Sequence, residues 1–303
     1  MKRYLLRVAY DGTAYCGWQI QPNGPTIEGE LNKALTELLN QKIEVIGASR
    51  TDSGVHSRGN VCVFDAETRI PAEKLAIALN QRLPGDIRVR ESKEVEPEFH
   101  PRHQDTVKTY EYKIYNDKIE NPLTRLYSKF CYLPLDAVKM QQGADFIVGE
   151  HDFTAFCSAG SSVESKVRTV YSCDILVDGV PVSAQNDSHS FTCKETTNCE
   201  SGLTGATATT DNSSSTCPEA TNCDSNESWQ GRTVTIRITG NGFLYNMVRI
   251  IAGTLMDVGL GRLGPDEVEE IIASKDRSCA GDTAEARGLT LVEIKYAKTA
   301  DEN

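Results

Sequence analysis

The sequence predicts a mixed α/β protein that begins with a ferredoxin-like unit. The first ninety residues show strand and helix patterns in the order β-α-β-β-α-β, which is the split βαβ order. The alternating run from Val107 to Tyr115 is the clearest strand in the chain. Strand and helix patterns continue to alternate after it, and we interpret them as elements around the same sheet.

The elements expected in the first ninety residues follow from apolar spacing and from turn residues. Alternating or β-rich runs predict strands at 4–10, 42–46, 60–64 and from 87 onward. Thr26 can cap a first helix, because its side chain can accept a bond from a free N–H at the helix N-terminus. Pro71 suits the first turn of a second helix. The apolar face predicted for that helix is Leu75, Ile77, Ala78 and Leu79.

The elements expected later in the chain are equally periodic. Strands are predicted at 107–115, 169–177, 234–238 and 289–296, and helices at 135–148, 243–258 and 265–273. Asp136 is the expected cap of the first of these helices. The second helix is mostly apolar and carries a single cation, Arg249.

Residues 186–230 do not fit this pattern. They are rich in Ser, Thr, Asn and Gly, a composition that cannot bury enough surface to fold alone. A nine-residue unit is repeated there, and its cysteines are Cys193, Cys199, Cys217 and Cys223. We interpret the segment as an expanded hairpin tip. A zinc site is the alternative, although paired zinc ligands are usually two to four residues apart.

Composition limits the class of protein. The chain has 303 residues, 39% of them hydrophobic, and no run is long enough to span a membrane. Charged residues interrupt the N-terminal apolar run, and six cysteines are scattered singly, so we expect a cytoplasmic protein without a signal peptide. The net charge of −11 argues against nucleic-acid binding. However, residues 186–230 hold seven acidic residues and one lysine, and basic clusters elsewhere can still bind phosphates.

The segment from Gly47 to Ser57 is the first candidate site. It is rich in Gly, Ser, Thr and Asp between two predicted strands, so it predicts a loop. Loops held by rigid strands often carry chemistry. This loop sets Arg50 and Asp52 two residues apart, with Arg58 nearby. The structural alternative is an Asx-turn, in which Asp52 bonds its own backbone.

Arg249 and Tyr110 are further candidates. A lone arginine among apolar residues is costly unless it is paired, so Arg249 forms either a structural ion pair or a pair with a functional carboxylate. Asp52 is the obvious partner, and a guanidinium beside it would lower the pKa of its carboxyl. An ionised Asp52 can act as a nucleophile or a base. Tyr110 is either a half-buried sheet tyrosine or a ring that stacks on a flipped base.

An ordered series of motifs resembles the TruA family of tRNA pseudouridine synthases. The motifs are Tyr10-Asp11-Gly12, Gly17-Trp18-Gln19, residues 50–56, residues 83–87, Phe99-His100-Pro101-Arg102, residues 108–112, residues 149–154, residues 243–249 and residues 288–291. Each motif alone is weak, but the ordered set is specific and runs from residue 4 to about residue 296. The insertion at 186–230 is not a usual feature of the family.

The resemblance implies an enzyme that isomerises uridine to pseudouridine at positions 38, 39 and 40 of the tRNA anticodon arm. No cofactor or metal is implied. Asp52 matches the essential aspartate of the family, and Arg249 matches the arginine that pairs with it. Tyr110 matches the tyrosine that packs on the uracil. Arg50 is expected to help extrude the base.

The remaining implications concern binding and architecture. Arg58, His100 and Arg102 are additional candidate contacts to the RNA, and family members are homodimers. The implied fold has two ferredoxin-like halves around a continuous, mostly antiparallel sheet. The expected division is an N-terminal half at 1–105 and a catalytic half at 106–303, interrupted by 186–230. A pseudouridine synthase for other RNA positions and an RNA-binding module without catalysis remain the alternatives.

Overall fold

The computed structural model describes residues 1–160, 163–182 and 231–296. The predicted insertion at 186–230, with its four cysteines, therefore lies outside the described residues. The described chain is a mixed α/β protein with one large, mostly antiparallel sheet, which confirms the predicted fold class. None of its helices is long and apolar enough to cross a membrane.

The elements alternate along the chain. The strands are β1 (Lys2–Tyr10), β2 (Ile46–Gly47), β3 (His56–Ala66), β4 (Ile87–Val95), β5 (Thr106–Asn116), β6 (Lys129–Cys131), β7 (Gly149–Asp152), β8 (Val167–Val177), β9 (Val180–Pro181), β10 (Arg232–Gly240) and β11 (Leu289–Tyr296). The helices are α1 (Ile27–Leu39), α2 (Leu75–Asn80), α3 (Ala137–Asp145), α5 (Met247–Gly259) and α6 (Glu267–Ser274).

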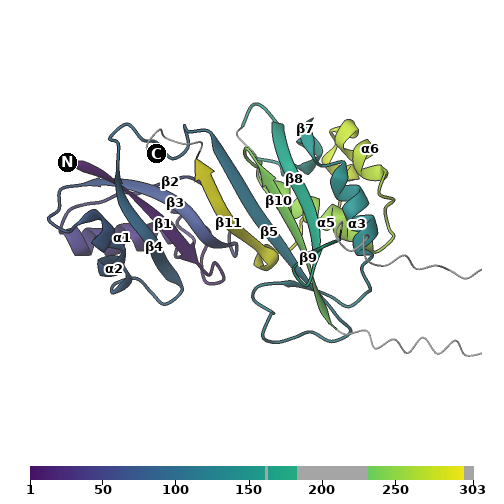
Figure 1. Ribbon diagram of the computed structural model, residues 1–303, viewed down its shortest axis with the longest axis horizontal. Helices are drawn as coiled ribbons and strands as arrows, with labels where there is room; N and C mark the ends of the chain where they lie inside the picture. The colour runs from purple at the N-terminus through teal and green to yellow at the C-terminus, as the bar shows by residue number, and fades with distance from the viewer. Residues whose placement is uncertain (161–162, 183–230, 297–303) are drawn as a thin grey trace, which may run out of the picture.

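The sheet repeats one strand order twice. Its path is β4-β1-β3-β11-β5-β10-β8-β7, with β2 beside β3. The strands β4-β1-β3-β2 form one set of four, and the strands β11-β5-β10-β8 form another. When the four strands of a set are numbered by their order along the chain, both sets lie in the sheet as fourth, first, third and second. A β-α-β-β-α-β unit produces this order. Figure 1 shows α1 and α2 at one end of the sheet, α3, α5 and α6 at the other, and β11 and β5 between them. The domain boundary at residue 105 stays a prediction.

The junction between the two strand sets lies on β3. At its C-terminal part, β3 pairs with β2 through Cys62 and Val63. At its N-terminal end, it pairs in parallel with β11 through His56 and Ser57. The loop between β2 and β3 therefore lies where the neighbour of β3 changes, and this loop carries Asp52.

Strand alternation distributes the apolar residues between two cores. On β1, Tyr4, Leu6 and Val8 pack into a cluster with residues of α1 and α2. Leu5 points the other way and joins the larger cluster under α3, α5 and α6. The caps predicted from sequence are present: Thr26 accepts from the backbone of Gly29, and Asp136 accepts from the first turn of α3.

The predicted strand at 42–46 is mostly wrong, because only Ile46 and Gly47 enter the sheet. Ile43 and Val45 are buried, so the alternation was informative about burial. Their backbone N–H groups donate to the side chains of Thr36 and Asn32 instead of to a strand. The hydrogen bonds of this segment are therefore satisfied without a sheet ladder.

Two other expectations are corrected by backbone geometry and exposure. The helix predicted from Phe243 begins at Met247, because Asn246 has φ of 60° and lies in the left-handed region. Ile77, expected on the apolar face of α2, is 58% exposed. Leu75 and Leu79 do pack into the core as predicted.

Candidate active site

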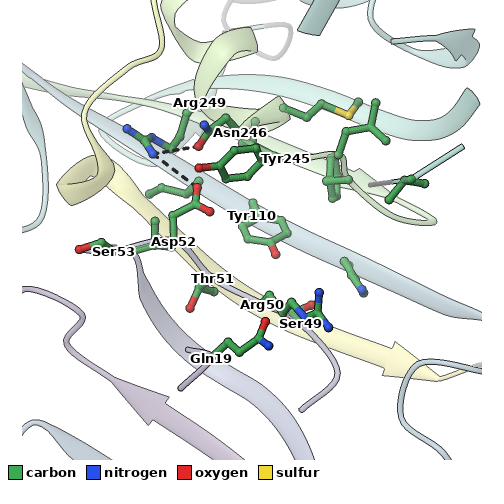
Figure 2. A pocket seen from close by; sticks show the side chains of 18 of the residues that line it. Gln19, Ser49, Arg50, Thr51, Asp52, Ser53, Tyr110, Tyr245, Asn246 and Arg249 are labelled. Carbon is green, nitrogen blue, oxygen red and sulfur yellow. Dashed lines mark hydrogen bonds and ion pairs between the residues drawn. The ribbon is translucent and has the colours of Figure 1, made fainter. Parts of the chain in front are cut away.

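A cavity of about 770 Å³ opens where the β2–β3 loop, β5 and the segment leading into α5 meet. Asp52 and Tyr110 line this cavity, and Figure 2 shows both with Arg249 and Asn246 above Asp52. Among the described residues, the lining holds four cations and Asp52 as its one acidic side chain. The cavity is therefore locally basic in a chain of net charge −11.

Buried hydrogen bonds hold the loop that carries Asp52. Asn60 on β3 is fully buried, and its side-chain amide donates to the carbonyl of Ser49 over 2.9 Å. The hydroxyls of Thr51 and Tyr10 lie 2.8 Å apart. Within the described chain, the Asp52 carboxylate bonds to an arginine and not to its own backbone, so the Asx-turn alternative does not hold.

The loop also rests against the segment before α1. The backbone N–H of Trp18 donates to the carbonyl of Thr51 over 3.0 Å. This contact requires glycine at position 17, where φ is 87° and a Cβ atom would lie 2.6 Å from the Thr51 carbonyl oxygen. The backbone beside Asp52 is thus positioned by a residue 35 places earlier in the sequence.

Replacing Gly17 by Ala should displace the Asp52 loop. We expect the melting temperature to fall by about 2–8 °C from backbone strain and turnover to fall about 100-fold from misplacement of Asp52. Calorimetry and single-turnover assays measure the two effects. Gly85→Ala is the matched control, because nothing lies within 4 Å of its Cβ position. Equal effects of the two substitutions would contradict this account of the loop.

Asp52 and Arg249 form an ion pair, as predicted. The Nη1 atom of Arg249 lies 3.4 Å from Oδ2 of Asp52, with side chains that are 17% and 25% exposed. Arg249 also donates from Nε to the carbonyl of Ala284 over 2.7 Å. The guanidinium therefore joins α5 to both the Asp52 loop and the segment before β11.

The pKa of the Asp52 carboxyl differs in direction from the sequence-based expectation. Burial raises it above its ordinary value, and the charge of Arg249 and its hydrogen bond only oppose that rise. The prediction that the pair lowers this pKa is wrong in net direction. The ion pair alone lowers the pKa of the carboxyl, but the desolvation of the half-buried carboxylate outweighs that effect.

Asn246 was not predicted as a site residue. Its Oδ1 accepts from Nη1 of Arg249 over 3.0 Å, and its Nδ2 donates to Oγ of Ser158 over 2.9 Å. Because Nη1 also contacts Asp52, Asn246 orients the nitrogen that faces the carboxylate. An asparagine tolerates the left-handed backbone found here, but the sequence alone does not reveal this conformation.

Tyr110 lies against the cavity from β5. Its ring packs edge-on to Phe243, with centroids 5.3 Å apart, and the side chain is buried. Burial raises the pKa of its hydroxyl to about 12, so the phenol stays protonated at neutral pH. Tyr245, which was not singled out from the sequence, is half exposed at the same cavity and labelled in Figure 2.

The arginines that were also predicted to contact RNA lie in two different places. Arg50 and Arg102 line the cavity, and Nε of Arg102 donates to the carbonyl of Gly47 over 2.7 Å. Arg58 lies 3.5 Å from the carboxylate of Glu111, which alternates with Tyr110 along β5 and faces the other side of the sheet. The structure therefore does not bring Arg58 to the cavity.

His100 is also outside the cavity lining. It stacks on His103 with ring centroids 3.8 Å apart, and its Nδ1 accepts from the backbone of Arg102. This hydrogen bond stabilises the turn that contains Arg102. Any contact of His100 with RNA stays a prediction.

Comparison with known proteins agrees with the geometry. A family model described as tRNA pseudouridine synthase matches residues 7–104 and 144–297. The chain belongs to the tRNA pseudouridine synthase family. Similar proteins named tRNA pseudouridine synthase A occur in Brevibacillus brevis, at 40% identity, and in Thermoanaerobacter sp. strain X514 and Ruminiclostridium cellulolyticum, each at 39%. Each alignment covers 98% of this chain and 100% of the relative.

Family membership gives the cavity a chemical context. An enzyme that acts on a base of folded RNA must take that base out of its stack and place reactive side chains beside it. The cavity supplies Asp52 beside Tyr110 and surrounds them with cations. The family assignment and the residues in the cavity thus indicate the same class of reaction.

Proposed function

We propose that this protein isomerises uridine to pseudouridine in tRNA, at positions 38, 39 and 40 of the anticodon arm. The observation that carries the proposal is the Asp52–Arg249 pair, which lies in a basic cavity beside Tyr110. Membership of the tRNA pseudouridine synthase family supports the reaction and the RNA class. The positions follow from the resemblance of the motifs to the TruA family.

The reaction conserves the atoms of the base and changes only its attachment. The bond between C1′ and N1 breaks, the uracil turns, and C5 bonds to C1′. The proton on C5 leaves, and N1 gains one. Asp52 acts as the nucleophile or base at the sugar, and Arg249 stabilises its ionised form. Tyr110 holds the uracil plane while the base is detached.

The target uridine must first leave its stack. Flipping a base costs a few kcal/mol, which contacts between the protein and the RNA must offset. Arg50 and Arg102 line the cavity and can bind the opened RNA. RNA shape, read through the backbone, then selects the anticodon arm.

The proposed enzyme works in the cytoplasm as a homodimer, with one tRNA that spans both subunits. Analytical ultracentrifugation with and without tRNA tests this part separately. A monomer that binds tRNA at one-to-one stoichiometry would contradict the dimer and leave the isomerase activity standing.

The test of function is a map of pseudouridines in tRNA from cells that lack this protein. We expect loss of pseudouridine at positions 38, 39 and 40, restored by the wild-type gene and not by Asp52→Asn. Loss at other RNA positions would point to a different substrate. An unchanged map would refute the isomerase.

We expect activity to be independent of metal ions. The described residues include no group of three or more His, Cys, Asp or Glu side chains placed to hold a metal. Dialysis against a chelator should leave single-turnover rates unchanged, with RNA binding measured in parallel to show that the RNA remains folded. Loss of turnover that added zinc restores, at constant RNA binding, would overturn this expectation.

A further inference from the structure

The cations of the cavity differ in what they contact. Arg249 is engaged by Asp52, Asn246 and Ala284, so its donors are largely committed within the protein. In residues 1–160, 163–182 and 231–296, no carboxylate pairs with Arg50 or Lys108. The cavity therefore contains positive charge that the described protein does not neutralise.

Lys108 is the cation that the strand places next to Tyr110. Residues two apart on a strand share a face, and they are separated by roughly 7 Å along it. Lys108 and Tyr110 both line the cavity, as this spacing requires. Unlike Arg50, which is exposed, Lys108 is half-buried.

The surroundings of Lys108 disfavour its charge. Burial lowers the pKa of its ammonium, and the nearby charges of Arg102 and Arg168 lower it further. Arg102 belongs to the turn before β5 and lines the same cavity, whereas Arg168 lies at the start of β8. An anion bound beside Lys108 would relieve both the repulsion and the loss of hydration.

We propose that Lys108 binds the backbone phosphate next to the nucleotide whose base stacks on Tyr110, with Arg102 of the same cavity beside it. The proposal rests on the proposed function and adds a positioning role that the reaction itself does not specify. A phosphate is the expected anion because every RNA nucleotide carries one and a lysine binds it as a point charge. Figure 2 shows Arg50 and Arg249 on opposite sides of Tyr110, so Arg50 lies away from the arginine that pairs with Asp52.

Lys108→Met tests the contact through RNA binding. We expect the dissociation constant for the anticodon stem-loop to rise about tenfold. The slope of log affinity against log salt concentration should decrease in magnitude by about 1, as expected for the loss of one phosphate contact. The matched control is Lys113→Met, which changes a lysine of the same strand and burial class on the opposite face. If both variants show the same affinity and salt dependence as the wild type, the proposal is wrong.

A modified RNA tests the partner of Lys108 directly. The probe is the stem-loop with uridine at position 39, made with one uncharged methylphosphonate linkage 5′ or 3′ to that uridine. Wild-type protein should bind one of these RNAs about tenfold more weakly than the unmodified RNA. Lys108→Met should show no further loss with that RNA, because the two changes remove the same contact. Full, additive losses would overturn the assignment.

The experiment separates this proposal from the proposed function. Lys108→Arg keeps the charge and should retain most of the binding, and the methylphosphonate measurement on wild-type protein needs no variant to fold. Wild-type protein that binds neither modified RNA more weakly than the unmodified one would refute the role of Lys108. Wild-type protein that shows the binding effect but forms no pseudouridine would instead refute the isomerase.

Discussion

Asp52→Asn should abolish isomerisation while the fold and RNA binding survive. The substitution keeps the shape of the side chain and an oxygen for Arg249, but it removes the charge that makes the group reactive. We expect single-turnover product formation to fall at least about 1,000-fold. Filter binding of the same RNA should change little, because Asp52 contributes negative charge to a site that binds an anion.

The raised pKa of Asp52 gives this variant a second, independent signature. A carboxyl whose pKa is higher in the folded than in the unfolded protein favours its protonated form on folding. Its contribution to stability is present at low pH and is lost as the pH rises through the folded-state pKa. At neutral pH, the ionised Asp52 therefore costs stability, and Asp52→Asn should melt no lower than the wild type.

The control for Asp52→Asn is Asp266→Asn, which changes an exposed aspartate at the N-terminus of α6 that makes no side-chain cap. This variant should keep wild-type turnover and melting. Appreciable turnover in Asp52→Asn would remove Asp52 from the chemistry. A much lower melting temperature would show that its charge serves the fold instead.

Arg249→Met should lose activity far more than stability. The substitution removes the guanidinium contacts with Asp52 and with the carbonyl of Ala284. The backbone N–H of Ala284 still donates to the carbonyl of Arg249, so the segment before β11 stays attached to α5. We expect turnover at neutral pH to fall about 100-fold to 10,000-fold.

The pH profile distinguishes a functional Arg249 from a structural one. The guanidinium lowers the pKa of Asp52 against the effect of burial, so its removal should raise that pKa further. The acid limb of turnover should then move to higher pH, because ionised Asp52 is lost at a higher pH. Arg249→Lys, which keeps a positive charge, should show a smaller displacement of this limb.

The control for Arg249 is Arg262→Met, which removes an exposed arginine paired with Asp257 near the end of α5. Its pH profile should match that of the wild type. An Arg249→Met variant with an unchanged acid limb would show that the pair does not tune Asp52. A variant that no longer folds would support the structural ion pair that the sequence left open.

The parts of this structure that the sequence predicted well depend on local periodicity. The segment Val107–Tyr115 alternates through Tyr110, Tyr112 and Ile114, and its strand runs from Thr106 to Asn116. The caps at Thr26 and Asp136 are likewise local, since each side chain bonds to its own helix. The backbone N–H of Val45 donates to the side chain of Asn32 on α1 and not to a neighbouring strand, so the strand predicted there is wrong.

The sequence predicted the part of the candidate site in which a residue has few possible partners. A lone arginine in an apolar helix needs a partner, and Arg249 does lie against Asp52. The sequence could not show that Arg58 faces Glu111, because adjacency to a motif does not fix the face of a strand. It also could not show that Lys108 joins Arg102 at the cavity, since their approach depends on the turn before β5.

The most direct test of the central claim is release of hydrogen from C5 of uridine. Joining C5 to C1′ expels that hydrogen, so a tRNA transcript with tritium at C5 of its uridines reports each isomerisation. We predict that purified wild-type protein releases tritium until all uridines at positions 38, 39 and 40 are converted, and that Asp52→Asn releases none. No release by the wild type, or undiminished release by Asp52→Asn, would contradict the account.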